Sequence, residues 1–249
     1  MTKKAPDIWS SLRALTAARI GLKRSGASLA TGPLLDFRLA HARARDAVHE
    51  ELDEGRLRGE LATLGRPVLT AASAVESREH FLMRPDLGRK LADTATLATH
   101  AGDYDVVFVI AGGLSARAVM AHAAPLLREA LPALTDWRIA PLVVVRYGRV
   151  AIGDAVAAAL GARAVAVLIG ERPGLTSPDS MGAYLTWAPA PQTTDAERNC
   201  ISNIRPDGIG YADAGFKLVH LLRAMRTRGI SGVALKDESD RLLIGDGGH

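Results

Sequence analysis

Residues 141–173 determine the fold most strongly, and they read PLVVVRYGRVAIGDAVAAALGARAVAVLIGERP. The runs at 141–145 and 163–170 are rich in small and branched apolar residues, which predicts two strands buried on both faces. Between them, Ile152, Val156 and Leu160 recur on one stripe, which predicts a helix. A strand, a helix and a second strand in this order form one unit of a parallel sheet covered by helices.

The same alternation continues on both sides of this unit. Apolar patterning predicts three further strands and two further helices, at 67–75, 103–110 and 183–189 and at 115–131 and 213–229. The last helix repeats apolar residues at i, i+3, i+4 and i+7 between Leu218 and Met225, and Gly229 ends it. We therefore predict an α/β fold whose main element is a Rossmann-like, mostly parallel sheet.

The first hundred residues have a different pattern. Apolar residues recur at helical spacing in three segments, near 10–20, from Pro33 toward Val48 and across 84–102. We place a domain boundary near residue 101, so that residues 1–100 form a mainly helical region. Residues 101–249 then form the Rossmann-like domain.

Composition excludes several classes of protein. With 249 residues, 48% of them hydrophobic, the chain can bury a substantial core. No apolar run approaches the ~20 residues of a membrane helix, and the N-terminus has no signal-peptide pattern. The single cysteine excludes an internal disulfide, and the seven histidines form no metal-ligand motif. We expect a cytoplasmic protein that binds neither a membrane nor a metal ion through its own side chains.

Positive charge is concentrated near the N-terminus. Residues 1–48 contain nine Lys or Arg and three Asp or Glu, a net charge of +6, whereas the whole chain carries +4. Such a block fits an acidic protein surface or a nucleic acid, or is simply a solvated helix face. The chain has no helix-turn-helix, RNA-recognition or aromatic stacking pattern, so we expect no nucleic-acid partner.

Two predicted strands end in loops that suit a ligand, because open α/β sheets bind ligands beyond the carboxyl ends of their strands. In RYGRV, at 146–150, Gly148 permits close approach of a flat ligand and Val150 adds apolar surface. In GERPGL, Glu171 directly follows a predicted strand, where its carboxylate can accept hydrogen bonds from amide groups. A salt bridge to Arg172 or Arg198 is the equally weighted alternative for Glu171.

A third loop, AGGLS at 111–115, is a glycine-rich turn between a strand and a helix. It lacks the GxGxxG fingerprint of a dinucleotide site, so a nicotinamide-dependent oxidoreductase is the less favoured hypothesis.

Cys200 lies in the segment RNCISNIRP, which contains no histidine to activate a thiol. We interpret Cys200 as a packing or ligand-contact residue, surrounded by short polar side chains suited to amide contacts. Since His, Cys and the carboxylates form no convincing acid–base or nucleophile set, we predict no catalytic residue in this chain.

Several of these segments, in the same order, resemble the small subunit of ethanolamine ammonia-lyase. The segments that carry the resemblance are ARIGLKRSG, LLDFRLAHARARDAV, RPDLGRKL, GGLSARAV, RYGRVAIGD, IGERPGL, AERNCISNIRP and SGVALKD. The resemblance implies that the chain holds part of adenosylcobalamin through positions matching Val150, Glu171 and Cys200. The chain lacks the DxHxxG motif, so a histidine ligand to cobalt is not expected.

The resemblance also implies a partner and a reaction. In this family a large TIM-barrel subunit contains the substrate pocket, and the two subunits form a hexamer of heterodimers. The complex converts ethanolamine to acetaldehyde and ammonia by radicals that arise from homolysis of the Co–C bond. Some members have a long N-terminal extension linked to packaging in a bacterial microcompartment. Here only about ten residues precede the first predicted helix, so packaging by that route is in doubt, and both the cytoplasm and a microcompartment within it stay open as the location.

Overall fold

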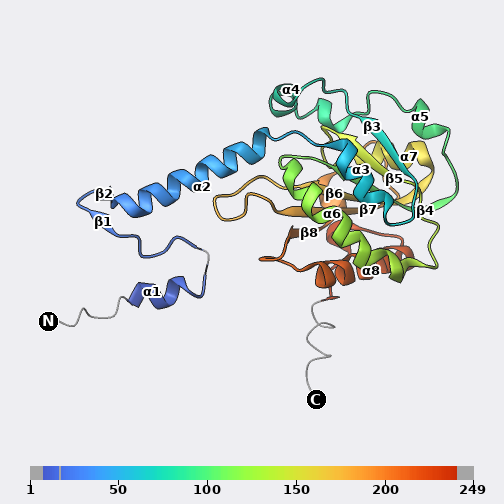
Figure 1. Ribbon diagram of the computed structural model, residues 1–249. Coiled ribbons are helices and arrows are strands. Elements are labelled where there is room, and N and C mark those ends of the chain that lie inside the picture. Colours follow the sequence, from blue (N-terminus) through green and yellow to red (C-terminus); the bar gives the residue numbers. More distant parts are fainter. Residues whose placement is uncertain (1–7, 17, 240–249) are drawn as a thin grey trace, which may run out of the picture.

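The computed structural model describes residues 8–16 and 18–239 and is built around one six-stranded sheet (Figure 1). The strands lie in the order β3–β5–β4–β6–β7–β8. Their bounds are β3 Val68–Ala72, β4 Tyr104–Ala111, β5 Leu142–Arg146, β6 Ala162–Gly170, β7 Met181–Trp187 and β8 Asn199–Ile204. The predicted α/β class and mostly parallel sheet are confirmed.

The sheet has a parallel part and an antiparallel part. β3, β5, β4 and β6 run parallel, whereas β7 and β8 are added antiparallel at one edge. The reason is the connection after β6, because residues 171–180 contain no helix and a parallel return needs a crossover of a dozen or more residues. The apolar pattern predicted β7 but not β8, whose residues Asn199, Ser202 and Asn203 are polar and interrupt the alternation.

Helices cover both faces of the sheet. On one face lie α3 (Glu54–Ala62), α6 (Ala116–Ala130) and α8 (Tyr211–Arg228), and on the other lie α5 (Ala95–Ala98) and α7 (Ile152–Leu160). The crossover through α6 leads from β4 to β5, and the crossover through α7 leads back in the opposite direction, from β5 to β6. Because both crossovers are right-handed, their helices lie on opposite faces of the sheet.

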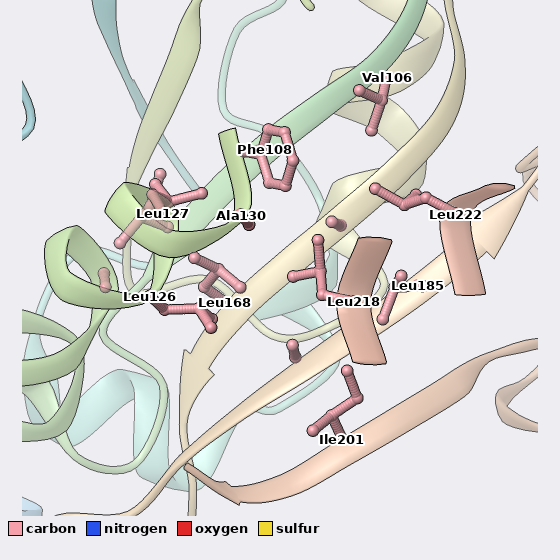
Figure 2. Close-up of a cluster of buried hydrophobic side chains, with 14 of the residues drawn as sticks. Val106, Phe108, Leu126, Leu127, Ala130, Leu168, Leu185, Ile201, Leu218 and Leu222 are labelled. Atoms are coloured by element: carbon pink, nitrogen blue, oxygen red, sulfur yellow. The ribbon is translucent and has the colours of Figure 1, made fainter. Parts of the chain in front are cut away.

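Each face of the sheet has its own apolar core. Figure 2 shows the core beneath α6 and α8, where side chains from the sheet meet side chains from both helices. The labelled residues are Val106, Phe108, Leu126, Leu127, Ala130, Leu168, Leu185, Ile201, Leu218 and Leu222. The second core lies beneath α7 and includes Val109, Val145, Val156 and Val167.

The N-terminal segment extends away from the sheet (Figure 1). It contains α1 (Ile8–Arg13), a short hairpin of β1 (Arg24–Ser25) and β2 (Ser28–Leu29), and the long α2 (Thr31–His49). Among the residues of α2, all of which the structure describes, only Ala47 is buried. We call residues 8–46 the N-terminal arm.

The segment at 84–102 differs from the single helix predicted for it. It contains a 3₁₀ turn at Leu87–Arg89 and the short α5, and it follows the short α4 (Arg78–Met83). Between the turn and α5 the backbone is extended and pairs with the end of β3, since Ala92 donates to Ala72 and Ala74 donates to Lys90. This pairing competes with helix formation, so the prediction of one long helix was wrong.

β3 comes from the first hundred residues of the chain, yet it pairs along its whole length with β5. The chain before residue 101 therefore contributes one edge of the sheet, while the domain division near residue 101 stays a prediction. Within residues 8–16 and 18–239, the structure has no helix with the length and apolar character needed to span a membrane.

Gly170 at the end of β6 allows the turn after β4 to approach closely. A Cβ at this position would collide with the carbonyl oxygens of Ser115 and Gly112, the latter at 2.6 Å. Gly170→Ala should therefore lower the free energy of unfolding by about 1–3 kcal/mol or more, measured by urea denaturation.

The matched control is Gly59→Ala in α3, where an added Cβ meets nothing within 4 Å. This variant should be unchanged or up to about 1 kcal/mol more stable, because alanine is the better helix former. Equal unfolding midpoints for Gly170→Ala and the parent chain would contradict the close packing described here.

Candidate functional site

A cleft of about 460 Å³ lies at the carboxyl ends of β4, β5 and β6. It combines apolar, carboxylate, guanidinium and phenol side chains with glycine backbone. The lining residues are Gly113, Leu114, Arg149, Val150, Ile169, Gly170, Glu171, Arg172 and Tyr184. The sequence analysis placed its candidate loops at this edge of the sheet.

Sheet topology explains the position of this cleft. From β4 the chain crosses to β5 on one side, and from β5 it crosses back to β6 on the other side of β4. The loops that follow β4 and β6 therefore belong to connections that leave in different directions, which opens a crevice between them. The cleft lies at this switch point of the sheet.

The glycine-rich turn after β4 forms one wall of the cleft. Gly113 has φ of +57°, a left-handed conformation that glycine adopts without strain, and Leu114 N–H donates to Gly170 O at 3.0 Å. Arg78 is buried beneath the turn and donates to Gly113 O at 2.7 Å and to Leu114 O at 3.1 Å. A third bond from Arg78 to Val48 O, at 2.7 Å, connects the turn to the end of α2.

The RYGRV turn after β5 forms a second wall. Arg149 lies with its guanidinium 4.1 Å from the ring centre of Phe81 and donates to Phe81 O at 3.1 Å. Burial lowers the pKa of Arg149, and the neighbouring Arg89 adds to that effect. Val150 is half-buried, packs against the core beneath α7 and leaves part of its side chain in the cleft.

Glu171 lies at the mouth of the cleft, directly after β6. Its backbone N–H donates to Ser180 O at 2.9 Å, and its carboxylate accepts from Asn203 N–H at 3.2 and 3.3 Å. A Cβ at Gly182 would lie only 3.0 Å from the carboxylate, so this glycine leaves room for Glu171. The carboxylate keeps acceptor capacity toward the cleft.

The predicted alternative of a salt bridge between Glu171 and Arg198 is wrong. Arg198 instead forms a buried, bidentate ion pair with Asp154. The sequence contains no signal for this choice, because it depends on how α7 packs against the sheet.

Cys200 lies opposite Tyr184 in the register of β7 and β8, and Tyr184 lines the cleft. Although Cys200 is exposed, loss of water around the thiol raises its pKa, and the charge of Glu171 adds to that effect. Burial also raises the pKa of Tyr184, and its interaction with Cys200 contributes. A thiol held in its protonated form is a poor nucleophile, which agrees with a contact role.

The structure therefore brings the three predicted site residues into one region. Val150 and Glu171 line the cleft, and Cys200 adjoins it through Tyr184. Their role as ligand contacts stays a prediction. Arg78, Arg149 and Tyr184 were not predicted as site residues, because no local motif distinguishes them from surface or core residues.

Neither the cleft nor its surroundings offer a metal centre. Within the part of the chain that the structure describes, no group of three or more His, Cys, Asp or Glu side chains is placed to hold a metal ion. His122 is buried and held between Tyr211 OH and Asp179 O, both at 2.9 Å. These bonds fix the base of the loop at 171–180, which carries Glu171.

Comparisons with known proteins agree on one family. The family model described as "Ethanolamine ammonia-lyase light chain (EutC)" matches residues 6–236. A protein of Xanthomonas campestris pv. campestris named "Ethanolamine ammonia-lyase small subunit" is 54% identical over 247 residues, covering 96% of this chain and 91% of that protein. A protein of the same name from Rhodopseudomonas palustris is 54% identical over 246 residues, covering 96% and 94%.

Proposed function

The chain belongs to the ethanolamine ammonia-lyase light-chain family, and we propose that it is the small subunit of this lyase, which binds part of adenosylcobalamin beside a large catalytic subunit. The observation that carries the proposal is the match to this family along residues 6–236. The competing hypothesis of a nicotinamide-dependent oxidoreductase has no support from the family.

The chemistry of the cleft fits a corrin. A corrin is a broad apolar macrocycle with carboxamides around its edge, so it needs apolar walls with hydrogen-bond donors and acceptors at the rim. Leu114, Val150 and Ile169 supply apolar surface. Glu171 supplies acceptors for amide N–H groups, while Arg149 and Arg172 supply donors for amide carbonyls. Adenosylcobalamin supplies a Co–C bond whose homolysis starts radical chemistry.

The residues of this chain bind and orient rather than react. Val150 forms an apolar wall, and Glu171 accepts hydrogen bonds from a corrin amide. Cys200 and Tyr184 contact the corrin from the surface of β7 and β8 that adjoins the cleft. Within this proposal, residues 101–249 form a Rossmann-like cobalamin-binding domain after a mainly helical region at 1–100. The alternation of strands and helices around the switch point supports that description.

The large subunit in this proposal is a TIM barrel that holds ethanolamine, and the complex is a hexamer of heterodimers in the cytoplasm. The N-terminal arm supports the existence of a partner. An isolated helix is marginally stable in water, yet the 19-residue α2 exposes Leu35 and Leu39 and buries little. Basic side chains such as Arg38 and Arg43 lie on the same helix, so an acidic surface with apolar pockets would complement it.

The first test is reconstitution of activity. The purified chain should not deaminate ethanolamine even with adenosylcobalamin, because the described residues contain no convincing acid–base or nucleophile set. Adding the large subunit should produce acetaldehyde, measured with a coupled dehydrogenase. Robust acetaldehyde formation by this chain alone would refute the assignment of roles.

The second test concerns Glu171. Glu171→Ala removes a charge-assisted hydrogen bond of about 1.5–3 kcal/mol, which should raise the Kd of adenosylcobalamin for the complex roughly tenfold or more. The kcat at saturating cofactor should remain near the parent value. Cys200→Ala should have a smaller effect, also confined to affinity. The control is Glu60→Ala, a carboxylate on α3 outside the cleft.

If Cys200→Ala abolished turnover at saturating cofactor in a complex that still assembles, the thiol would have a chemical role. The reading of Cys200 as a contact residue would then be wrong.

The third test concerns the N-terminal arm. Leu35→Gln combined with Leu39→Gln should raise the Kd for the large subunit roughly tenfold, because exposed apolar anchors dominate such interfaces. Circular dichroism of the free chain should not change, since both side chains are more than half exposed. The control is Val233→Gln, which alters an exposed apolar residue far from the arm in sequence. Undiminished affinity of the double variant would place the docking surface elsewhere.

A further inference from the structure

The buried ion pair between Asp154 and Arg198 connects α7 with the residue before β8. We use the word groove for the cleft together with the adjoining surface of Tyr184 and Cys200. Arg198 Nη1 lies 2.8 Å from Asp154 Oδ1, and Arg198 Nη2 lies 2.6 Å from Asp154 Oδ2. The side chain of Arg198 is only 2% exposed and that of Asp154 only 9%. A bidentate pair of this kind has a fixed geometry as well as a favourable energy.

The neighbours of this pair belong to the segments that border the groove. Asp154 lies in the first turn of α7, four residues after Val150, and Arg198 lies two residues before Cys200. Arg198 Nη1 also donates to Thr186 Oγ1 at 3.0 Å, and Thr186 lies two residues from Tyr184 in β7. One guanidinium therefore holds α7, β7 and the start of β8 together.

Other bonds hold the start of β8 to a different part of the molecule. Asn199 donates to Leu235 O at 2.8 Å and accepts from Gly232 N–H at 2.7 Å, which fixes β8 to the segment after α8. The ladder with β7 holds β8 in the sheet, and the ion pair adds a direct side-chain link between α7 and the residue just before β8. Since buried ion pairs often contribute little net stability compared with apolar residues, a role in fixing geometry is a natural reason to retain one.

We infer that the Asp154–Arg198 pair is a positioning device that sets the separation between Val150 and Cys200, and thereby the width of the groove. The part of this inference that concerns cobalamin rests on the proposed function. The pair touches neither substrate nor reacting atoms, and it acts through the placement of Cys200 and Val150.

The first experiment needs no cofactor. Cys200 is the only cysteine of the chain, so the rate at which the full-length chain reacts with Ellman's reagent reports on this position alone. Asp154→Asn keeps the shape of the side chain but breaks the charge pair. It should accelerate the reaction roughly tenfold, because a loosened β8 lets more water reach the thiol and so lowers its raised pKa. The control is Leu57→Ala, which destabilises the core where α3 packs against β3 and β5, away from β8, and should leave the rate near that of the parent chain.

The second experiment measures the Kd of adenosylcobalamin for the complex by equilibrium dialysis. Asp154→Asn and Arg198→Gln should each raise the Kd roughly tenfold and lower the Tm, because each leaves a buried charge without its bidentate partner. The double variant removes the unpaired charge, so its Tm should recover, while its Kd should stay high because the rigid fork is absent. If the ion pair contributed to stability alone, the double variant would recover the parent Kd when it recovers the parent Tm.

The inference is overturned if the thiol rate of Asp154→Asn equals that of the parent chain, or if the Kd of the double variant returns to the parent value together with the Tm. If the parent complex binds no cobalamin at all, the proposed function fails. The thiol experiment then still decides whether the ion pair positions Cys200.

Discussion

The parallel pairing of β4 with β6 is the interaction on which the rest of the structure depends. The two strands stay in register from Tyr104 opposite Ala162 to Ala111 opposite Ile169, and most of their residues are fully buried. Both apolar cores include side chains from this pair, so α6 and α8 on one face and α7 on the other are anchored to it. Because the two strands end together, the turn after β4 lies against Gly170, and both this turn and Glu171 line the cleft.

The antiparallel extension gives the cleft its polar side. β7 and β8 bury Ala183, Leu185 and Ile201 beneath α8, and they direct Tyr184 and Cys200 toward the side where α7 lies. No second βαβ unit could supply this arrangement, because its crossover helix would cover that face. Because the loop at 171–180 contains no helix, β7 runs antiparallel to β6 and the surface beside the cleft stays uncovered.

Arginine side chains hold the walls of the cleft in place. Arg78 bonds three backbone carbonyls, Arg149 stacks on Phe81, and Arg198 pairs with Asp154. A guanidinium suits these positions because its planar set of donors can satisfy several acceptors from separate segments at once. Of these anchors, Arg78 reaches α2 at Val48, near the end of the helix, so residues 31–46 project beyond it. This agrees with a segment that gains its stability from a partner.

The sequence by itself determined the α/β class, the positions of β4, β5 and β6 with the helices between them, and the loops that carry Val150 and Glu171. These features depend on local apolar periodicity, which is visible without knowledge of the fold. It did not reveal β8, whose polar and apolar residues do not alternate as in a typical half-buried strand. It also did not reveal the extended backbone near Leu91, which forms because β3 is adjacent. The ion-pair partner of Arg198 could not be predicted either, since the sequence does not distinguish Asp154 from Glu171 as the carboxylate beside it. Only the tertiary structure decided that Arg198 pairs with Asp154 and that Cys200 lies beside Tyr184. The reason is that helix packing and strand register bring together residues that are distant along the chain.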